Sequence, residues 1–171
     1  WFEDDDNGGL FYTPHDHEEL IYRSKPFDDN ILPSPNGVAA KVFLRLGILL
    51  AEPRYTEAAQ RILMAGYSVM SQLPENHLTM VHAWEEYRQA IPIVMLLDDG
   101  SMESWQTDIQ ANFTDKVMCF RVPSWEHIYP VEMLALERGE GIVCCGDEVS
   151  EPFHSRIELI AELSGLLSST K

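Results

Sequence analysis

A continuous apolar run near the middle of the chain places the tightest limit on its fold. Residues Ile91 to Leu97 form this run, and Asp98, Asp99 and Gly100 close it. A short apolar run that ends in turn residues is typical of a strand buried on both faces of a sheet. Before the run, apolar residues recur at helical spacing. The sequence therefore predicts a helical part followed by an α/β part.

The residues after this run predict a small open sheet with helices against it. A helix is expected over 102–113 and a second strand over 116–122, which together with the first strand make a βαβ unit. A third strand is expected over 141–145, and an amphipathic helix over 152–167 closes the chain. Five apolar residues are expected on the inner face of that helix: Phe153, Ile157, Ile160, Leu163 and Leu167.

The helical part begins at Ser34, an N-cap residue that is followed by Pro35 at the first helical position. One helix is expected over 35–51 and a second over 54–72, because the residue before Pro53 avoids helical backbone. So short a connection makes the two helices an antiparallel hairpin. Four apolar residues give the first helix its spacing: Val38, Val42, Leu46 and Leu49.

A loop is expected before the hairpin and a third helix after it. Residues 1–33 are expected to form a loop, with a turn at Gly8 and Gly9 and a short strand over 10–13. The acidic run within this loop predicts a solvated segment, with a calcium site as the alternative. A third helix is expected over 75–89.

Charge, hydropathy and cysteine content disfavour several classes of protein. The net charge is −16, and such a surface repels the phosphates of nucleic acids. No apolar run approaches the roughly 20 residues of a membrane span. The three cysteines, of which two are adjacent, suit no ordinary disulfide framework. We therefore expect no nucleic-acid partner, no membrane span and a reducing intracellular compartment.

One N-terminal stretch resembles a known family. Phe11 and Tyr12 form an aromatic pair, D-H-E-E-L follows at 16–20, and R-S-K-P-F-D-D-N-I-L-P-S-P-N at 23–36 leads into the first helix. This stretch is similar to thioredoxin-domain-containing proteins of the spermatogenesis-associated protein 20 family, where the last element reads R-x-K-x3-D-x3-P-S-G-N. Pro35 replaces the family glycine. The match continues through the hairpin, where PRYTEAAQRIL is similar to ERYREAAERTL, and into the strand after it.

The resemblance implies a thioredoxin-like domain joined to an (α/α)6 toroid similar to the N-acylglucosamine 2-epimerase and six-hairpin glycosidase folds. A toroid of six hairpins needs more helices than the three expected here. The resemblance thus implies the C-terminal part of a larger protein, with a loop and the last hairpin or hairpins of the toroid in 1–90 and a small α/β domain in 91–171. The family often ends in Y-V-C-x4-C-x2-P. Cys144 and Pro152 match that element, but Val149 stands at its second cysteine.

Asp29, Arg23 and Lys25 are the candidate catalytic residues. The resemblance places their segment near the central cavity of the toroid, where sugar-processing relatives carry acid and base groups. A carboxylate near two cations stays ionised and can act as a base or bind a polyol hydroxyl. The alternative is a structural pair between Asp29 and Arg23 that fixes the loop ahead of the first helix. One carboxylate without a partner specifies no mechanism.

The histidines favour structural roles, and we expect no metal and no cofactor. In an extended strand His15 and His17 point to one side and Asp16 to the other, with no third ligand nearby. His77 and His82 lie about 140° apart around a helix and cannot bind one ion from a single face.

The cysteines and tryptophans also favour structural roles. The acidic residues Asp147 and Glu148 are expected to raise the thiol pKa of Cys144 and Cys145, which favours structural cysteines. The tryptophans could stack on sugars but are more often core residues: Trp84, Trp105 and Trp125.

Two functional hypotheses follow. In the first, the chain is a non-catalytic segment of a thioredoxin-fold and six-hairpin protein, and its parent binds or processes a carbohydrate-like ligand. In the second, the chain is a structural or interaction subunit of a larger multi-chain assembly. Both depend on one prediction, that the hairpin presents more apolar surface than this chain covers by itself. The partner would be the rest of the parent chain in the first case and other subunits in the second.

Overall fold

The computed structural model describes residues 1–18, 21–114, 116–123, 137–146 and 148–168. The chain divides into two compact units. The helical unit comprises Trp1–Gly47 and Glu52–Gln89, and the sheet unit comprises Ile48–Ala51 and Ala90–Lys171. The expected mixture of helices with a small sheet is confirmed.

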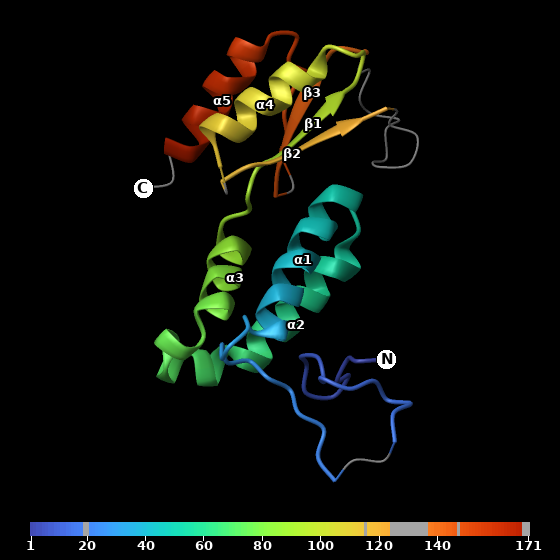
Figure 1. Ribbon diagram of the computed structural model, residues 1–171, viewed down its shortest axis with the longest axis vertical. Coiled ribbons are helices and arrows are strands. Elements are labelled where there is room, and N and C mark those ends of the chain that lie inside the picture. Colours follow the sequence, from blue (N-terminus) through green and yellow to red (C-terminus); the bar gives the residue numbers. More distant parts are fainter. Residues whose placement is uncertain (19–20, 115, 124–136, 147, 169–171) are drawn as a thin grey trace. The chain divides into compact units, whose positions relative to one another are not determined.

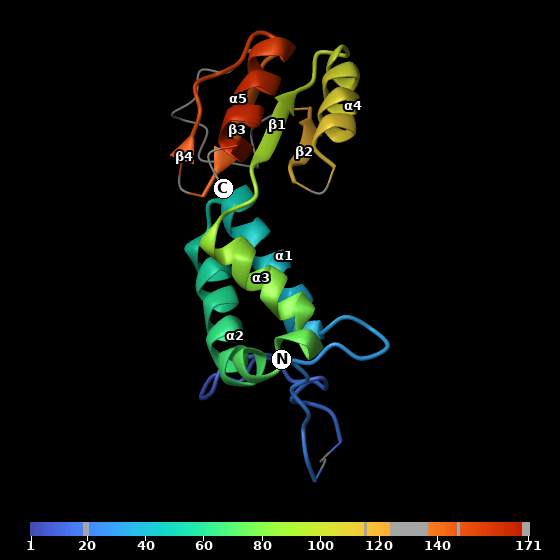
Figure 2. The same ribbon diagram turned by 90° about the vertical axis from the view of Figure 1, so that its left-hand side faces the viewer.

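The helical unit contains most of α1 (Pro35–Leu50), together with α2 (Pro53–Gln72) and α3 (Leu78–Arg88). They run alongside one another, and the N-terminal loop lies at one end of them (Figures 1 and 2). The first two helices agree with expectation to within a residue. The third was expected as one helix over 75–89, but a short 3-10 turn, η1 (Pro74–Asn76), precedes it, and the two are separated at His77.

The ends of α1 follow the local signals in the sequence. The Ser34 hydroxyl oxygen accepts a hydrogen bond from the amide of Gly37 at 3.2 Å, as an N-cap residue should. At the other end Ala51 has a positive φ of 50°, and Pro53 begins α2 at a position where its missing N–H costs nothing.

The residues that α1 buries are not those that gave its spacing. Val38 and Val42 are 45% and 47% exposed. At about 3.6 residues per turn they lie on the opposite side of the helix from the buried stripe. Gly37 shows why that stripe is small: a Cβ there would lie 2.9 Å from the backbone carbon of Thr79. The buried stripe comprises Asn36, Gly37, Ala40, Leu44 and Gly47.

The core between the three helices is compact and is crossed by one charged pair. The Arg45 guanidinium donates two hydrogen bonds to the Glu86 carboxylate, at 2.7 and 3.1 Å, and so links α1 to α3. Such a bidentate pair fixes geometry as well as distance. The apolar core comprises Ala40, Ile62, Leu63, Met70, Met80 and Ala83.

The sheet unit contains one mixed sheet in the order β2-β1-β3-β4. Its strands are β1 (Ile93–Leu97), β2 (Met118–Val122), β3 (Gly141–Cys145) and β4 (Glu148–Val149). β1 and β2 are parallel, as a βαβ unit requires, whereas β3 is antiparallel to β1. The three expected strands are confirmed, and the two-residue β4 was missed.

β1 is buried on both faces, as its sequence predicts. Val94 and Leu96 face a cluster that includes residues of α4 (Met102–Asn112) and α5 (Arg156–Ser168), and these two helices cover that side of the sheet (Figure 1). The alternate residues pack on the other side with side chains of β2 and β3. That second cluster comprises Ile93, Met95, Leu97, Val122, Ile142 and Cys144.

Two further expectations were wrong. The closing helix begins at Arg156 and not at 152, and Ile157 is exposed. The rest of the expected inner face packs as predicted: Leu163 is buried, and Phe153, Ile160 and Leu167 contact the same cluster. The strand expected over 10–13 is reduced to a single bridge between Leu10 and Glu3.

None of the described helices combines the length and the apolar character that a membrane crossing requires.

Candidate functional site

Asp29 connects the starts of two helices. One carboxylate oxygen accepts from the amide of Ser34 and the other from the amide of Thr79, both at 2.8 Å. The Asp29 amide donates to the carbonyl of Asn76 at 2.7 Å. Burial would raise the pKa of Asp29, but hydrogen bonds from Thr79 and Ser34 outweigh it and hold the pKa below its usual value. Both carboxylate oxygens are thus engaged by backbone at the N-termini of α1 and α3.

Lys25 closes the turn at the start of the chain. Its ammonium donates to the Asp4 carboxylate at 2.6 Å and to the Gly8 carbonyl at 2.9 Å. The other oxygen of Asp4 accepts from the amides of Asp6 and Asn7. The Lys25 hydrogen bond, followed by that from Asn7, lowers the pKa of Asp4 to about 2. Within the acidic run, Asp4 is therefore held by Lys25, whereas Asp5 and Asp6 are exposed. No group of described residues is arranged to hold a metal ion.

Arg23 makes a third set of contacts. Its guanidinium donates to the carbonyl of Thr13 at 2.6 Å and lies 3.9 Å above the ring of Phe11, in a cation–π contact. Arg23 and Lys25 thus share a contact with the Phe11 ring, which lies 5.3 Å from the Lys25 ammonium, whereas the contacts of Asp29 are with backbone at the starts of α1 and α3.

Asn36, which belongs to the 23–36 motif but was given no role from the sequence, lies at the centre of this region. Its side-chain nitrogen donates to the carbonyls of Leu10 and Pro26 at 3.0 and 2.9 Å, and its oxygen accepts from the amide of Leu10 at 2.7 Å. Asn36 is fully buried. The signal for its burial in the sequence is a short polar side chain in the first turn of the helix. Asp29, Ser34 and Asn36 thus hold the loop against the helices.

An open groove of about 490 Å³ lies in the helical unit and was also missed. Its walls are mostly aromatic and proline side chains from the N-terminal loop and α1. Trp1 and Tyr12 are 77% and 71% exposed at its edge. The clue in the sequence is the density of aromatic residues among the first twelve. The lining comprises Trp1, Phe2, Glu3, Leu10, Phe11, Tyr12, Pro26, Pro35 and Phe43.

The edge of this groove at Glu3 is acidic. Arg61 of α2 forms a salt bridge with the Glu3 carboxylate. This pairing raises the pKa of Arg61, and the charges of Glu57 and Asp5 act in the same direction. Three carboxylates thus act on one guanidinium, but only Glu3 is in contact with it.

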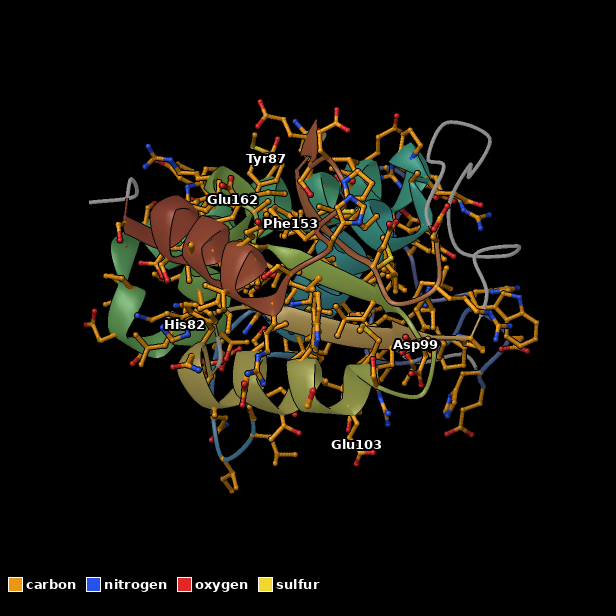
Figure 3. The ribbon with its side chains drawn as sticks, turned by 90° about the horizontal axis from the view of Figure 1, so that it is seen from above. His82, Tyr87, Asp99, Glu103, Phe153 and Glu162 are labelled. Carbon is orange, nitrogen blue, oxygen red and sulfur yellow. The ribbon has the colours of Figure 1, made fainter. Side chains whose placement is uncertain are left out.

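The histidines are placed separately. His15 packs edge-on against the ring of Trp1 at 5.8 Å, and His17 is exposed. His77 is buried, with Nδ1 2.8 Å from the carbonyl oxygen of Leu73. His82 is exposed on α3 (Figure 3).

The cysteines are buried or half-buried thiols. Burial raises the pKa of Cys119 to about 12 and that of Cys144 to about 11. The pKa of Cys145 is raised by burial first and by Glu148 second. Burial, more than the acidic neighbours, therefore disfavours the reactive thiolate. Three other residues considered in the sequence lie outside the described residues: Glu19, Trp125 and Asp147.

Charged residues also gather where β1 ends. Figure 3 shows Asp99 in the loop after β1 and Glu103 on the first turn of α4. Arg121 lies 3.6 Å from Asp98 and 3.8 Å from Glu103, and these distances describe a loose surface group.

Comparison with known proteins gives no relative for the chain. No family model matches it, no curated protein matches it, and no solved structure matches it.

Proposed function

We propose that this chain is a non-catalytic segment of a protein with a thioredoxin-like domain and an (α/α)6 toroid, whose parent binds or processes a carbohydrate-like ligand. The helical unit would supply the last hairpin or hairpins of the toroid. The proposal is carried by one observation, the exposure of Val38 and Val42 on the side of α1 opposite its buried stripe. Hairpins of a toroid bury such a side against neighbouring hairpins.

Exposed apolar residues on α2 add support. Met64, Tyr67 and Val69 are each about half exposed. Large apolar groups that face water on two neighbouring helices are typical of a surface that another helix or chain covers. The contacts of Asp29, Arg23 and Lys25 support the non-catalytic part of the proposal, because each of these residues holds the loop in place.

The second candidate is a structural or interaction subunit of a larger multi-chain assembly, which the same exposed side of α1 favours. Intact mass spectrometry of the native protein separates the two. A polypeptide several times longer, with a C-x2-C sequence upstream, supports the toroid protein. A mature chain that starts near Trp1 and copurifies with fixed partners supports the subunit. A parent without the thioredoxin-like domain would refute the first proposal.

The apolar side of α1 can be tested directly in the 171-residue chain. We expect this chain to associate or to bind a hydrophobic dye, and the double variant Val38→Ser and Val42→Ser should reduce both. Ile157→Ser is the matched control, because Ile157 is an exposed apolar residue of α5 in the sheet unit. A monodisperse, dye-negative chain with a cooperative melt would count against both candidates.

A further inference from the structure

The aromatic groove offers a different kind of surface from the exposed side of α1. Five of its lining residues are aromatic and two are prolines, and these stiff side chains change little in conformation when a ligand packs on them. Its only charged lining residue is Glu3. A groove with this lining favours a ligand that presents flat, apolar side chains and needs few hydrogen bonds from the protein.

A polyproline-type segment has these properties. Its backbone makes no internal hydrogen bonds, and its proline rings pack against aromatic side chains in open grooves. The exposed rings of Trp1 and Tyr12 stand at the groove edge, where a segment lying across the surface would meet them. An open groove, as opposed to an enclosed cavity, admits a chain that continues in both directions.

The acidic edge selects the charge of the ligand. Glu3, the charged residue of the lining, is paired with Arg61, and the charges of Asp5 and Glu57 also act on this guanidinium, so carboxylates outnumber it here. Arg23 and Lys25 lie against Phe11 but are not among the lining residues, and Lys25 is paired with Asp4. The chain as a whole carries a net charge of −16. Electrostatic complementarity therefore favours a basic partner and disfavours an acidic one.

We infer that the groove binds an extended, proline-containing peptide segment that carries arginine or lysine at the end lying near Glu3. The inference goes beyond the proposed function, since it concerns the groove that the N-terminal loop forms with Pro35 and Phe43 of α1 and does not depend on Val38 and Val42.

The test is a binding titration of the 171-residue chain with a fluorescently labelled synthetic peptide of alternating prolines and alanines that ends in two arginines. We expect saturable binding that weakens as salt is added. Tyr12→Ala should weaken it by roughly fivefold or more, as loss of an aromatic anchor does. Tyr22→Ala is the matched control, because Tyr22 is 77% exposed and does not line the groove. Neither tyrosine is buried, so both variants should fold.

Two further comparisons examine the charge and the prolines. The double variant Asp5→Asn and Glu57→Gln should weaken binding and flatten its salt dependence, whereas Glu158→Gln in α5 should do neither. A peptide with glutamates for the arginines, or with alanines for the prolines, should bind several-fold more weakly. The inference is overturned if the arginine peptide does not bind, if Tyr12→Ala and Tyr22→Ala bind alike, or if the acidic peptide binds as well as the basic one.

Discussion

The two units of this chain are held together by different kinds of interaction. In the sheet unit, β1 is apolar throughout and is buried on both faces. In the helical unit, fully buried Ser34 and Asn36 and the carboxylate of Asp29 tie the loop to the helices, while Val38 and Val42 face water. The sheet unit is therefore specified by its hydrophobic pattern. The helical unit is specified to a large degree by directional hydrogen bonds.

The largest expected effect tests whether the sheet unit depends on its buried apolar side chains. Leu96 is fully buried at the centre of β1, so Leu96→Ala should lower the free energy of unfolding by about 4 kcal/mol through lost burial and a cavity. Hydrogen exchange would measure this for each unit, with the loss confined to amides of the sheet unit. Ile157→Ala, at an exposed apolar position of α5, is the control and should change little. A comparable loss in both units would show that they unfold together.

A somewhat smaller effect tests whether the helical unit depends on its buried hydrogen bonds. Asn36→Ala removes three hydrogen bonds and leaves the amide and carbonyl of Leu10 without their partner. Because an unpaired buried polar group costs about 1–3 kcal/mol, we expect a loss of roughly 3 kcal/mol in the helical unit. Asn30→Ala, at an exposed position of the same loop, should cost far less. If Asn36→Ala were also nearly neutral, the hydrogen bonds of Asn36 would not specify this unit.

The difference between the units also explains what could be predicted from the sequence. Three of the four strands of the sheet unit, its βαβ connection and its two helices were predictable. The clearest case is β1, because burial on both faces leaves a continuous apolar run. The start of α5 was not predictable to the residue. Its register depends on Phe153, which forms a bridge with Gly141 and stays outside the helix. The short β4 contains too few residues to produce a pattern.

The helical unit was predictable in its elements but not in its contacts. Ser34 and Pro53 mark the helix starts locally, so α1 and α2 were expected within a residue of where they lie. Which side of α1 turns inward depends on how closely α3 approaches Gly37, and spacing alone does not encode that approach. Three hydrogen bonds of the Asp29 and Asn36 side chains reach backbone groups that are 26 to 50 residues away in sequence, so no local motif shows these partners.

A pair of glycine substitutions tests how much the close packing of α1 against α3 contributes to stability. A Cβ at Gly37 would meet the backbone of Thr79 and Met80, so Gly37→Ala should lower the free energy of unfolding by about 2 kcal/mol. Gly165 in α5 has open space around it, so Gly165→Ala should raise the free energy of unfolding by up to about 1 kcal/mol through better helix propensity. Urea denaturation measures both. If the two changes had equal effects on the free energy of unfolding, the close approach of α3 to Gly37 would contribute nothing to stability.

The smallest effect is a pH dependence that should belong mainly to the helical unit. The pKa of Asp4 is lowered from 3.8 to about 2 by Lys25 and Asn7, and that of Asp29 is lowered because hydrogen bonds from Thr79 and Ser34 outweigh its burial. A carboxyl group with a lowered pKa in the folded state stabilises that state above its unfolded pKa.

This stabilisation is lost as the pH falls from about 4 towards 2, because protons then bind the unfolded chain more tightly than the folded one. Hydrogen exchange or urea denaturation between these pH values should show the helical unit losing stability. Asp4→Asn should remove part of the slope, whereas Asp16→Asn, at an exposed position of the loop, should leave it unchanged. If Asp4→Asn kept the full slope, the contact with Lys25 would contribute little, and the helical unit would depend on Asp29 and the neutral hydrogen bonds of Asn36.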